Sequence, residues 1–207
     1  VYPSGITFSK SNDGIEWNMH FPPVLPLDGD AHNIMWEPED KFYILTTRSF
    51  QHYHIYGRLK IKRKRHIAIA RSKDLIHWTP LMTILEADEK DPENMELYRM
   101  YILPYGHGYI GFIETFLVHH SLSFGPCEVQ LAFSRNLIDW YRIGDRKVFL
   151  ERGKKGEWDA GMVMITFNPP FKRGESLVFW YGGKRGEHWQ SSEGGISCGE
   201  IRIDGFI

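Results

Sequence analysis

The chain has 207 residues, and its 25 Lys and Arg residues nearly balance its 26 Asp and Glu residues, which leaves a formal net charge of -1. This balance gives no support for binding to nucleic acid or to an anionic membrane surface, and 42% hydrophobic with 25% charged residues excludes a disordered chain. Aromatic residues make up 14% of the chain, alongside 20 Gly and 11 Pro residues. Because aromatic residues favour strands and Gly and Pro favour turns, the composition indicates an all-β domain of many short strands.

One segment recurs along the chain. It consists of an alternating apolar strand, a Ser, a polar turn and Ile-x-Trp, and its copies end at Trp17, Trp78 and Trp140, which are 61 and 62 residues apart. A fourth, degenerate copy covers residues 196–206. We expect the three Trp residues to pack between repeated units, because each recurs at the same place in its unit.

The intervals between these copies also match one another. Each contains a carboxylate, an apolar strand, a turn with Pro or Gly and a second strand rich in Tyr, over residues 30–48, 96–115 and 158–183. Four strands per repeat predict a blade of a β-propeller. The chain begins in the third strand of one blade and ends in the third strand of the fourth. We therefore expect a single β-propeller domain over residues 1–207 that covers only part of a closed propeller.

No membrane helix is expected, and the sequence as given shows no targeting segment. The longest apolar runs, such as residues 109–118, are shorter than the roughly 20 residues of a membrane helix. The chain begins at Val1 with no signal-peptide pattern, so we expect a soluble chain whose given sequence carries no targeting segment. The compartment is left open.

Three carboxylates occupy equivalent places in the repeat. In a propeller the innermost strand of each blade lines a central channel, so residues that open equivalent strands meet at one mouth. The first strands of the three intervals place Asp30, Glu96 and Asp159 there, 66 and 63 residues apart. Converging carboxylates repel one another and are costly to desolvate, so they commonly serve a chemical function. The alternative is that they cap turns as ordinary loop residues.

These carboxylates suit the cleavage of a glycosidic bond. One carboxyl can protonate the leaving oxygen while another attacks or activates water, and a third can orient the acid. Sugars are bound by polar side chains and aromatic platforms, and each residue of these types could equally be structural, for instance by pairing with a carboxylate or packing between blades. Six such candidates for substrate binding lie near the carboxylates: His32, Asn33, Arg48, Tyr98, Trp158 and Tyr181.

The remaining motifs are interpreted as structural. The run from Arg58 to Arg65 holds six cations in eight residues, and its alternation with apolar residues predicts a solvent-facing hairpin instead of a nucleic-acid site. Cys127 and Cys198 cannot form a disulfide framework. The paired histidines lack further ligands at metal-binding separations, so neither a metal nor an organic cofactor is expected; these pairs are His52 with His54 and His119 with His120.

Residues 69–78 and 131–140, together with the motifs at 158–162 and 180–183, resemble the five-bladed β-propeller glycosidases. That superfamily includes glycoside hydrolase families 32, 43, 62, 68 and 130. Over essentially the whole chain, stretches such as 30–33, 96–98, 104–105 and 203–206 are most similar to an uncharacterised bacterial group described as family 32-like. The resemblance implies a five-bladed propeller with catalytic carboxylates at the starts of inner strands. The Asn-Asp-Pro-Asn and Arg-Asp-Pro motifs of the invertases are absent from this sequence.

The sequence therefore favours a glycoside hydrolase that acts on an oligo- or polysaccharide. Glu96 is the favoured general acid, Asp30 the base or nucleophile, and Asp159 an orienting residue. A non-catalytic carbohydrate-binding propeller is the second hypothesis, because the invertase motifs are missing. A glycoside phosphorylase is the third, since it requires cations at the cleft, for which Arg48 and Arg99 are the candidates.

Overall fold

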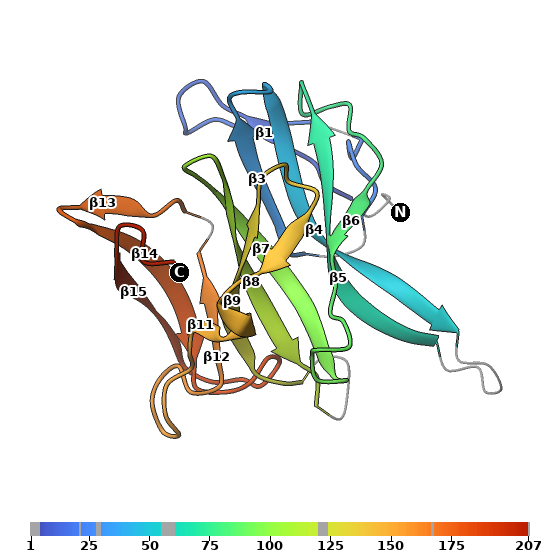
Figure 1. Ribbon diagram of the computed structural model, residues 1–207. Coiled ribbons are helices and arrows are strands. Elements are labelled where there is room, and N and C mark those ends of the chain that lie inside the picture. The colour runs from blue at the N-terminus through green and yellow to red at the C-terminus, as the bar shows by residue number, and fades with distance from the viewer. Residues whose placement is uncertain are drawn as a thin grey trace.

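A computed structural model describes residues 5–20, 22–27, 30–54, 61–119, 124–166 and 168–206, and the side chains of residues 51–54 and 61–63 are also outside the description. The described part is built from strands and one short 3-10 turn, Gly144–Arg146, and contains no α-helix. The predicted all-β class is confirmed (Figure 1).

The first complete sheet is an antiparallel meander in the order β3-β4-β5-β6. Its two central strands form a long hairpin that extends well beyond the rest of the molecule (Figure 1). The bounds are β3 His32–Glu37, β4 Phe42–His54, β5 Ile61–Ser72 and β6 Met82–Leu85. Two short strands precede this sheet and pair with each other: β1 Ser9–Lys10 and β2 Asn18–Met19.

Two further meanders follow. In the second, β7, β8 and β9 pair in sequence order. Both β10 and β11 pair with the edge of β9 that faces away from β8. In the third, β12 and β13 lie along one edge of β14 and β15 lies along the other. The bounds are β7 Met95–Tyr105, β8 Gly108–Leu117, β9 Cys127–Ser134, β10 Trp140–Arg142, β11 Val148–Leu150, β12 Met162–Ile165, β13 Phe171–Arg173, β14 Ser176–Lys184 and β15 Gly194–Arg202.

The three meanders are blades of a partial β-propeller, and apolar cores fill the spaces between them. Strand β7 contributes to both cores, because Met100 and Ile102 face the first blade while Tyr101 faces the third. This alternation follows from the two-residue period of a strand whose two faces are both covered. Burial of both faces places β7 and its neighbours at the centre of the fold.

The recurrent Ser-turn-Trp segments share one hydrogen-bonding pattern. In the third copy, Ser134 Oγ accepts a hydrogen bond of 2.9 Å from the backbone of Leu137, and the Trp140 indole donates one of 3.1 Å to the Leu137 carbonyl. The same two bonds occur at residues 11–17 and 72–78, although the bond from the indole of the first copy is 3.2 Å long. The third residue of the turn has a positive φ in every copy: Gly14, Leu75 and Leu137. The repeat therefore encodes a locally satisfied turn between the third and fourth strands.

The packing prediction for the repeated Trp residues is confirmed for one of them and wrong for another. Trp140 is 9% exposed and belongs to the core between the first two blades. Trp78 is half-buried, and Trp17 is 61% exposed. Only the two-residue strands β1 and β2 are formed near Trp17 in the described part of the chain, so no broad sheet face covers its ring.

Candidate active site

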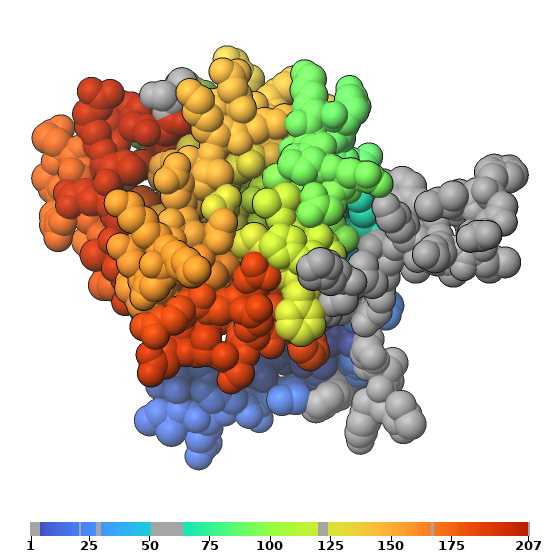
Figure 2. All heavy atoms as spheres, turned by 90° about the horizontal axis from the view of Figure 1, so that it is seen from below, coloured from blue at the N-terminus to red at the C-terminus, as the bar shows by residue number. Residues whose placement is uncertain are grey.

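The first strands of the three blades, β3, β7 and β12, run in the same direction, so their starts lie at one end of the molecule (Figure 1). The second strands are antiparallel to them and end there, as shown by the pairs of Met95 with Leu117 and of Met162 with Lys184. We call this end the mouth; Figure 2 looks towards it from below. Asp30, Glu96 and Asp159 all lie at or just before the starts of these strands, as the repeat predicts.

Asp30 is the exposed carboxylate of the three. Its Oδ1 accepts a hydrogen bond of 2.6 Å from Arg48 Nη2, and the exposed fractions of the two side chains are 77% for Asp30 and 10% for Arg48. The Arg48 guanidinium carbon lies 5.0 Å from the ring centroid of Tyr98. A cation in this position is attracted by the aromatic face. Arg48 thus links the Asp30 carboxylate to the start of β7.

Glu96 is buried and paired with a residue that the sequence assigned to solvent. Its Oε2 lies 2.6 Å from Arg65 Nη1 and accepts a second hydrogen bond, of 3.2 Å, from the Arg65 backbone N–H. The guanidinium carbon of Arg65 lies 5.1 Å from the ring centroid of Phe116 and 5.7 Å from that of Tyr98. The prediction of a solvent-facing basic run is therefore wrong for Arg65, because β5 turns this side chain towards the mouth. Residues 58–60 and the side chains of residues 61–63 lie outside the description.

Tyr98 connects the surroundings of Asp30 with those of Glu96. Its ring is contacted by both Arg48 and Arg65, and its hydroxyl lies 3.1 Å from Nε2 of His188. Burial is the main cause that raises the pKa of the Tyr98 hydroxyl, so it remains protonated at neutral pH. The sequence placed Tyr98 among the substrate-binding candidates, and the structure puts it between two ion pairs.

Asp159 forms a separate group with two predicted neighbours. The Tyr181 hydroxyl donates a hydrogen bond of 3.3 Å to Asp159 Oδ2, and the rings of Trp158 and Tyr181 stack with centroids 5.8 Å apart. Asp159 itself is buried. A Cβ added to Gly183 would lie 2.6 Å from the Asp159 Cβ, so the absence of a side chain there lets the carboxylate approach β14. The structure thus brings together the three candidates that come from the third interval.

His32 and Asn33 occupy the start of β3. The His32 Nδ1 lies 2.7 Å from the Thr47 hydroxyl, and the Asn33 carbonyl accepts a hydrogen bond of 3.4 Å from the Thr46 hydroxyl. Both residues are half-buried. The described contacts of His32 and Asn33 therefore anchor β3 to β4 close to Asp30.

Behind the mouth, sequence reasoning missed a buried carboxylate, Glu114. It is fully buried on β8 and pairs with Arg99, whose Nη2 also donates a hydrogen bond of 3.0 Å to the carbonyl of Ile165. Burial raises the pKa of Glu114 to about 7, against the opposing effect of the Arg99 charge. The Glu114 and Arg99 pair thereby links the second blade to the third through a titratable group.

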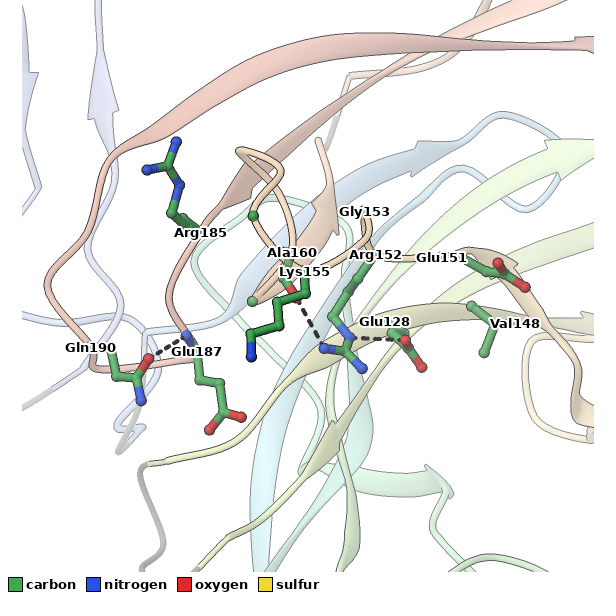
Figure 3. A pocket seen from close by; sticks show the side chains of 12 residues that line it. Glu128, Val148, Glu151, Arg152, Gly153, Lys155, Ala160, Arg185, Glu187 and Gln190 are labelled. Atoms are coloured by element: carbon green, nitrogen blue, oxygen red, sulfur yellow. Dashed lines mark hydrogen bonds and ion pairs between the residues drawn. The ribbon is translucent and has the colours of Figure 1, made fainter.

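A hollow of about 740 Å³ lies beside Asp159 and was not predicted from the sequence. Its walls come from β9, from the connection around residues 148–161 and from the loop at residues 185–190 (Figure 3). Arg152 crosses one side of it, with bonds of 2.9 Å to Glu128 Oε1 and 3.0 Å to the Ala160 carbonyl. Because three distant segments form this hollow, no local motif could have indicated it.

The described part of the chain contains no group of three His, Cys, Asp or Glu residues able to hold a metal ion. His119 Nδ1 lies 3.3 Å from Glu187 Oε2. His120 and the side chains of His52 and His54 lie outside the description. Within the same described part, no helix has the length and hydropathy needed to cross a membrane.

Comparison of the sequence with protein families and with curated proteins gives no match. Solved structures do match. A protein described as a glycoside hydrolase has a TM-score of 0.66 at 16% identity, and the match covers 96% of this chain and 57% of that one. A β-1,2-mannobiose phosphorylase from Listeria innocua, solved with β-1,2-mannobiose, has a TM-score of 0.61 at 16% identity and coverages of 96% and 50%.

The GH32 β-fructofuranosidase BmSUC1 of Bombyx mori has a TM-score of 0.60 at 15% identity, and the match covers 97% of this chain and 40% of that one. These likenesses support the β-propeller fold. This chain spans about half the length of the solved structures that it matches.

Proposed function

We propose that this chain holds a glycoside-cleaving site at the mouth of its propeller and acts on an oligo- or polysaccharide. The observation that carries the proposal is the placement of Asp30, Glu96 and Asp159 at equivalent strand starts in three successive blades. Aromatic rings lie close to them, with Tyr98 near Glu96 and the Trp158 and Tyr181 stack near Asp159. Carboxylates beside aromatic surfaces suit a sugar acetal and its apolar ring faces. The solved structures with the same fold also support the proposal, since they are described as a glycoside hydrolase, a β-1,2-mannobiose phosphorylase and a β-fructofuranosidase.

The surroundings of each carboxylate suit a different role in the cleavage of a glycosidic bond. Asp30 is open to solvent and can activate water as the base, or attack as the nucleophile. Glu96 is assigned as the general acid; to act so, its carboxylate must take up a proton and turn from Arg65 to the glycosidic oxygen, to which it then gives that proton. Asp159, held by the Tyr181 hydroxyl, orients the sugar or the acid.

The test measures hydrolysis of aryl glycosides whose leaving groups differ in pKa. Glu96→Gln is expected to lose most activity on poor leaving groups and to retain it on activated ones such as dinitrophenyl glycosides, because only poor leaving groups need a proton. Glu175→Gln, which changes an exposed carboxylate in the turn between β13 and β14 at the end opposite the mouth, is the matched control and is expected to keep full activity. If Asp159→Asn, and not Glu96→Gln, loses activity on poor leaving groups while keeping it on activated ones, the acid role would pass to Asp159. Unchanged activity in each of Asp30→Asn, Glu96→Gln and Asp159→Asn would overturn the proposed site.

A non-catalytic carbohydrate-binding role is the second candidate. It is favoured by the ion pairs that already engage Asp30 and Glu96. Calorimetry that detects sugar binding without turnover would support this role over hydrolysis. Turnover that depends on added inorganic phosphate would instead indicate phosphorolysis. Of the two cations that the sequence offered for it, Arg48 lies at the mouth and Arg99 is paired with the buried Glu114 behind it, whereas Arg65 adds a cation at the mouth.

A further inference from the structure

The loop between β14 and β15, residues 185–193, closes on itself at the mouth. The Arg185 backbone N–H donates a hydrogen bond of 3.1 Å to the carbonyl of Glu193, and the Gly186 N–H donates one of 2.8 Å to the Ser192 hydroxyl. In Figure 2 this red-orange loop lies next to the orange connection around residue 155, and both line the 740 Å³ hollow. These internal bonds hold the loop in one shape.

The tip of this loop presents Trp189 in an unfavourable backbone conformation. The Gln190 N–H donates a hydrogen bond of 3.0 Å to the Glu187 carbonyl, which makes residues 187–190 a tight turn. Trp189 is the third residue of the turn and has a φ of 68°, a value that favours Gly or Asn at this place. Its side chain is nonetheless 70% exposed. A strained backbone combined with an exposed large ring costs stability, and such features concentrate at functional sites.

The neighbouring His188 fixes the tip against the candidate active site. Its ring centroid lies 5.1 Å from that of Tyr98 and 5.1 Å from that of Phe116, and its Nε2 lies 3.1 Å from the Tyr98 hydroxyl. The His188 N–H also donates a hydrogen bond of 3.0 Å to the Gly125 carbonyl. The ring centroid of Trp189 is 6.3 Å from that of His188. Trp189 therefore lies next to His188, which packs against the two rings, Tyr98 and Phe116, that contact Arg65.

We propose that Trp189 is a platform on which a sugar ring of an oligosaccharide stacks, at a subsite next to the bond that is cleaved. The C–H face of a pyranose or furanose ring is apolar and fits an exposed indole, and a rigid loop binds it with little loss of conformational entropy. Glu187 and Gln190 flank the tip and line the hollow, where they can bond to sugar hydroxyls. This inference rests on the proposed function and narrows its substrate to chains of several sugar units.

The test compares Trp189→Ala with Trp17→Ala, a control that removes another exposed indole, 61% exposed and located just before β2. Both variants are measured on hexasaccharides of arabinose, xylose, mannose and fructose, and on aryl monosaccharides. Trp189→Ala is expected to raise KM about five- to tenfold for the hexasaccharide that is cleaved, with kcat unchanged and with no effect on the aryl monosaccharides. Equal KM values for Trp189→Ala and Trp17→Ala would overturn the platform.

A binding measurement on a variant impaired in catalysis tests the Trp189 platform separately from the proposed glycoside cleavage. Glu96→Gln protein is titrated with the same hexasaccharides by calorimetry, with and without Trp189→Ala. One outcome is that the unaltered chain cleaves none of these sugars while Glu96→Gln protein still binds one of them. If removal of Trp189 then abolishes that binding, the result would support the platform and contradict hydrolysis of these sugars. Trp189→Gly adds a check: it is expected to raise Tm, because Gly tolerates the positive φ, while weakening hexasaccharide binding. Tighter or unchanged binding in Trp189→Gly would contradict the platform.

Discussion

Arg65 Nη1 and Glu96 Oε2 lie 2.6 Å apart and join two blades, since Arg65 belongs to β5 and Glu96 to β7. Both side chains are less than one-tenth exposed. A buried pair of this kind compensates two charges that would each be costly alone. The first and second blades are therefore tied together at the mouth by the same carboxylate that we propose as the acid.

Breaking this pair is expected to cost stability. Arg65→Met leaves Glu96 buried without its cation and should lower the free energy of unfolding by about 3 to 5 kcal/mol. Glu96→Gln should cost less, because glutamine still accepts the hydrogen bond from the Arg65 backbone. Urea denaturation of both single variants and of the double variant gives the coupling energy. Additive effects would mean that the two side chains do not interact in solution.

Stability is expected to depend on Glu114 between about pH 4.5 and 7. The folded chain raises the pKa of Glu114 from 4.5 to about 7, so in this window the folded state binds more protons than the unfolded state. Stability from this group is thus fully present below pH 4.5 and is lost as the pH rises through 7, by up to about 3 kcal/mol. Glu114→Gln should remove this part of the slope. Parallel stability profiles for the two proteins, measured by denaturation at each pH, would refute the assignment.

The recurrent Trp residues should differ sharply in their contribution to folding. Trp140→Ala opens a cavity in the core between the first two blades and should cost about 3 to 5 kcal/mol. Trp17→Ala removes an exposed ring and should change stability by about 0.5 kcal/mol or less. Thermal unfolding followed by circular dichroism provides the comparison. Similar losses in both variants would show that Trp17 is covered in solution.

Gly161 is expected to be required where the loop of residues 185–193 meets β12. A Cβ at this position would lie 2.1 Å from the Gly186 carbonyl carbon, so Gly161→Ala must displace the loop and should cost about 1 to 3 kcal/mol. Gly182→Ala is the control, because the nearest atom to its added Cβ is 3.8 Å away. Trypsin should cut after Arg185 faster in Gly161→Ala than in Gly182→Ala. Equal cleavage rates would mean that the loop keeps its place.

The repeat made the fold and part of the site predictable. The spacing of Asp30, Glu96 and Asp159 located the strand starts, and the residues next to Asp159 did come together. Arg65 was missed because a run of cations usually indicates solvation. Its burial depends on which face of β5 turns towards the mouth, as set by its pairing with Phe50 across the hairpin.

The loop that carries His188 and Trp189 could not be found by comparing repeats. The equivalent loops of the other blades share no motif with it, so nothing in the spacing marked these residues. Their importance depends on a turn conformation and on contacts with Tyr98 and Phe116. Both features arise only when distant strands are assembled.

The contacts between the second and third blades determine which of their turns can change in sequence and length. Among the described residues, they share one parallel backbone pair, Met162 with Cys127, and it lies at the mouth. At the far end the two blades meet through a side chain instead, because the Tyr105 hydroxyl donates a hydrogen bond of 2.5 Å to Asp204 Oδ1 and accepts one of 2.9 Å from the Asp204 N–H. The nearby turns at residues 106–107 and 174–175 are exposed, so they can lengthen or change without moving the mouth. Evolution can therefore remodel the rim opposite the mouth while the distances between the carboxylates stay constant.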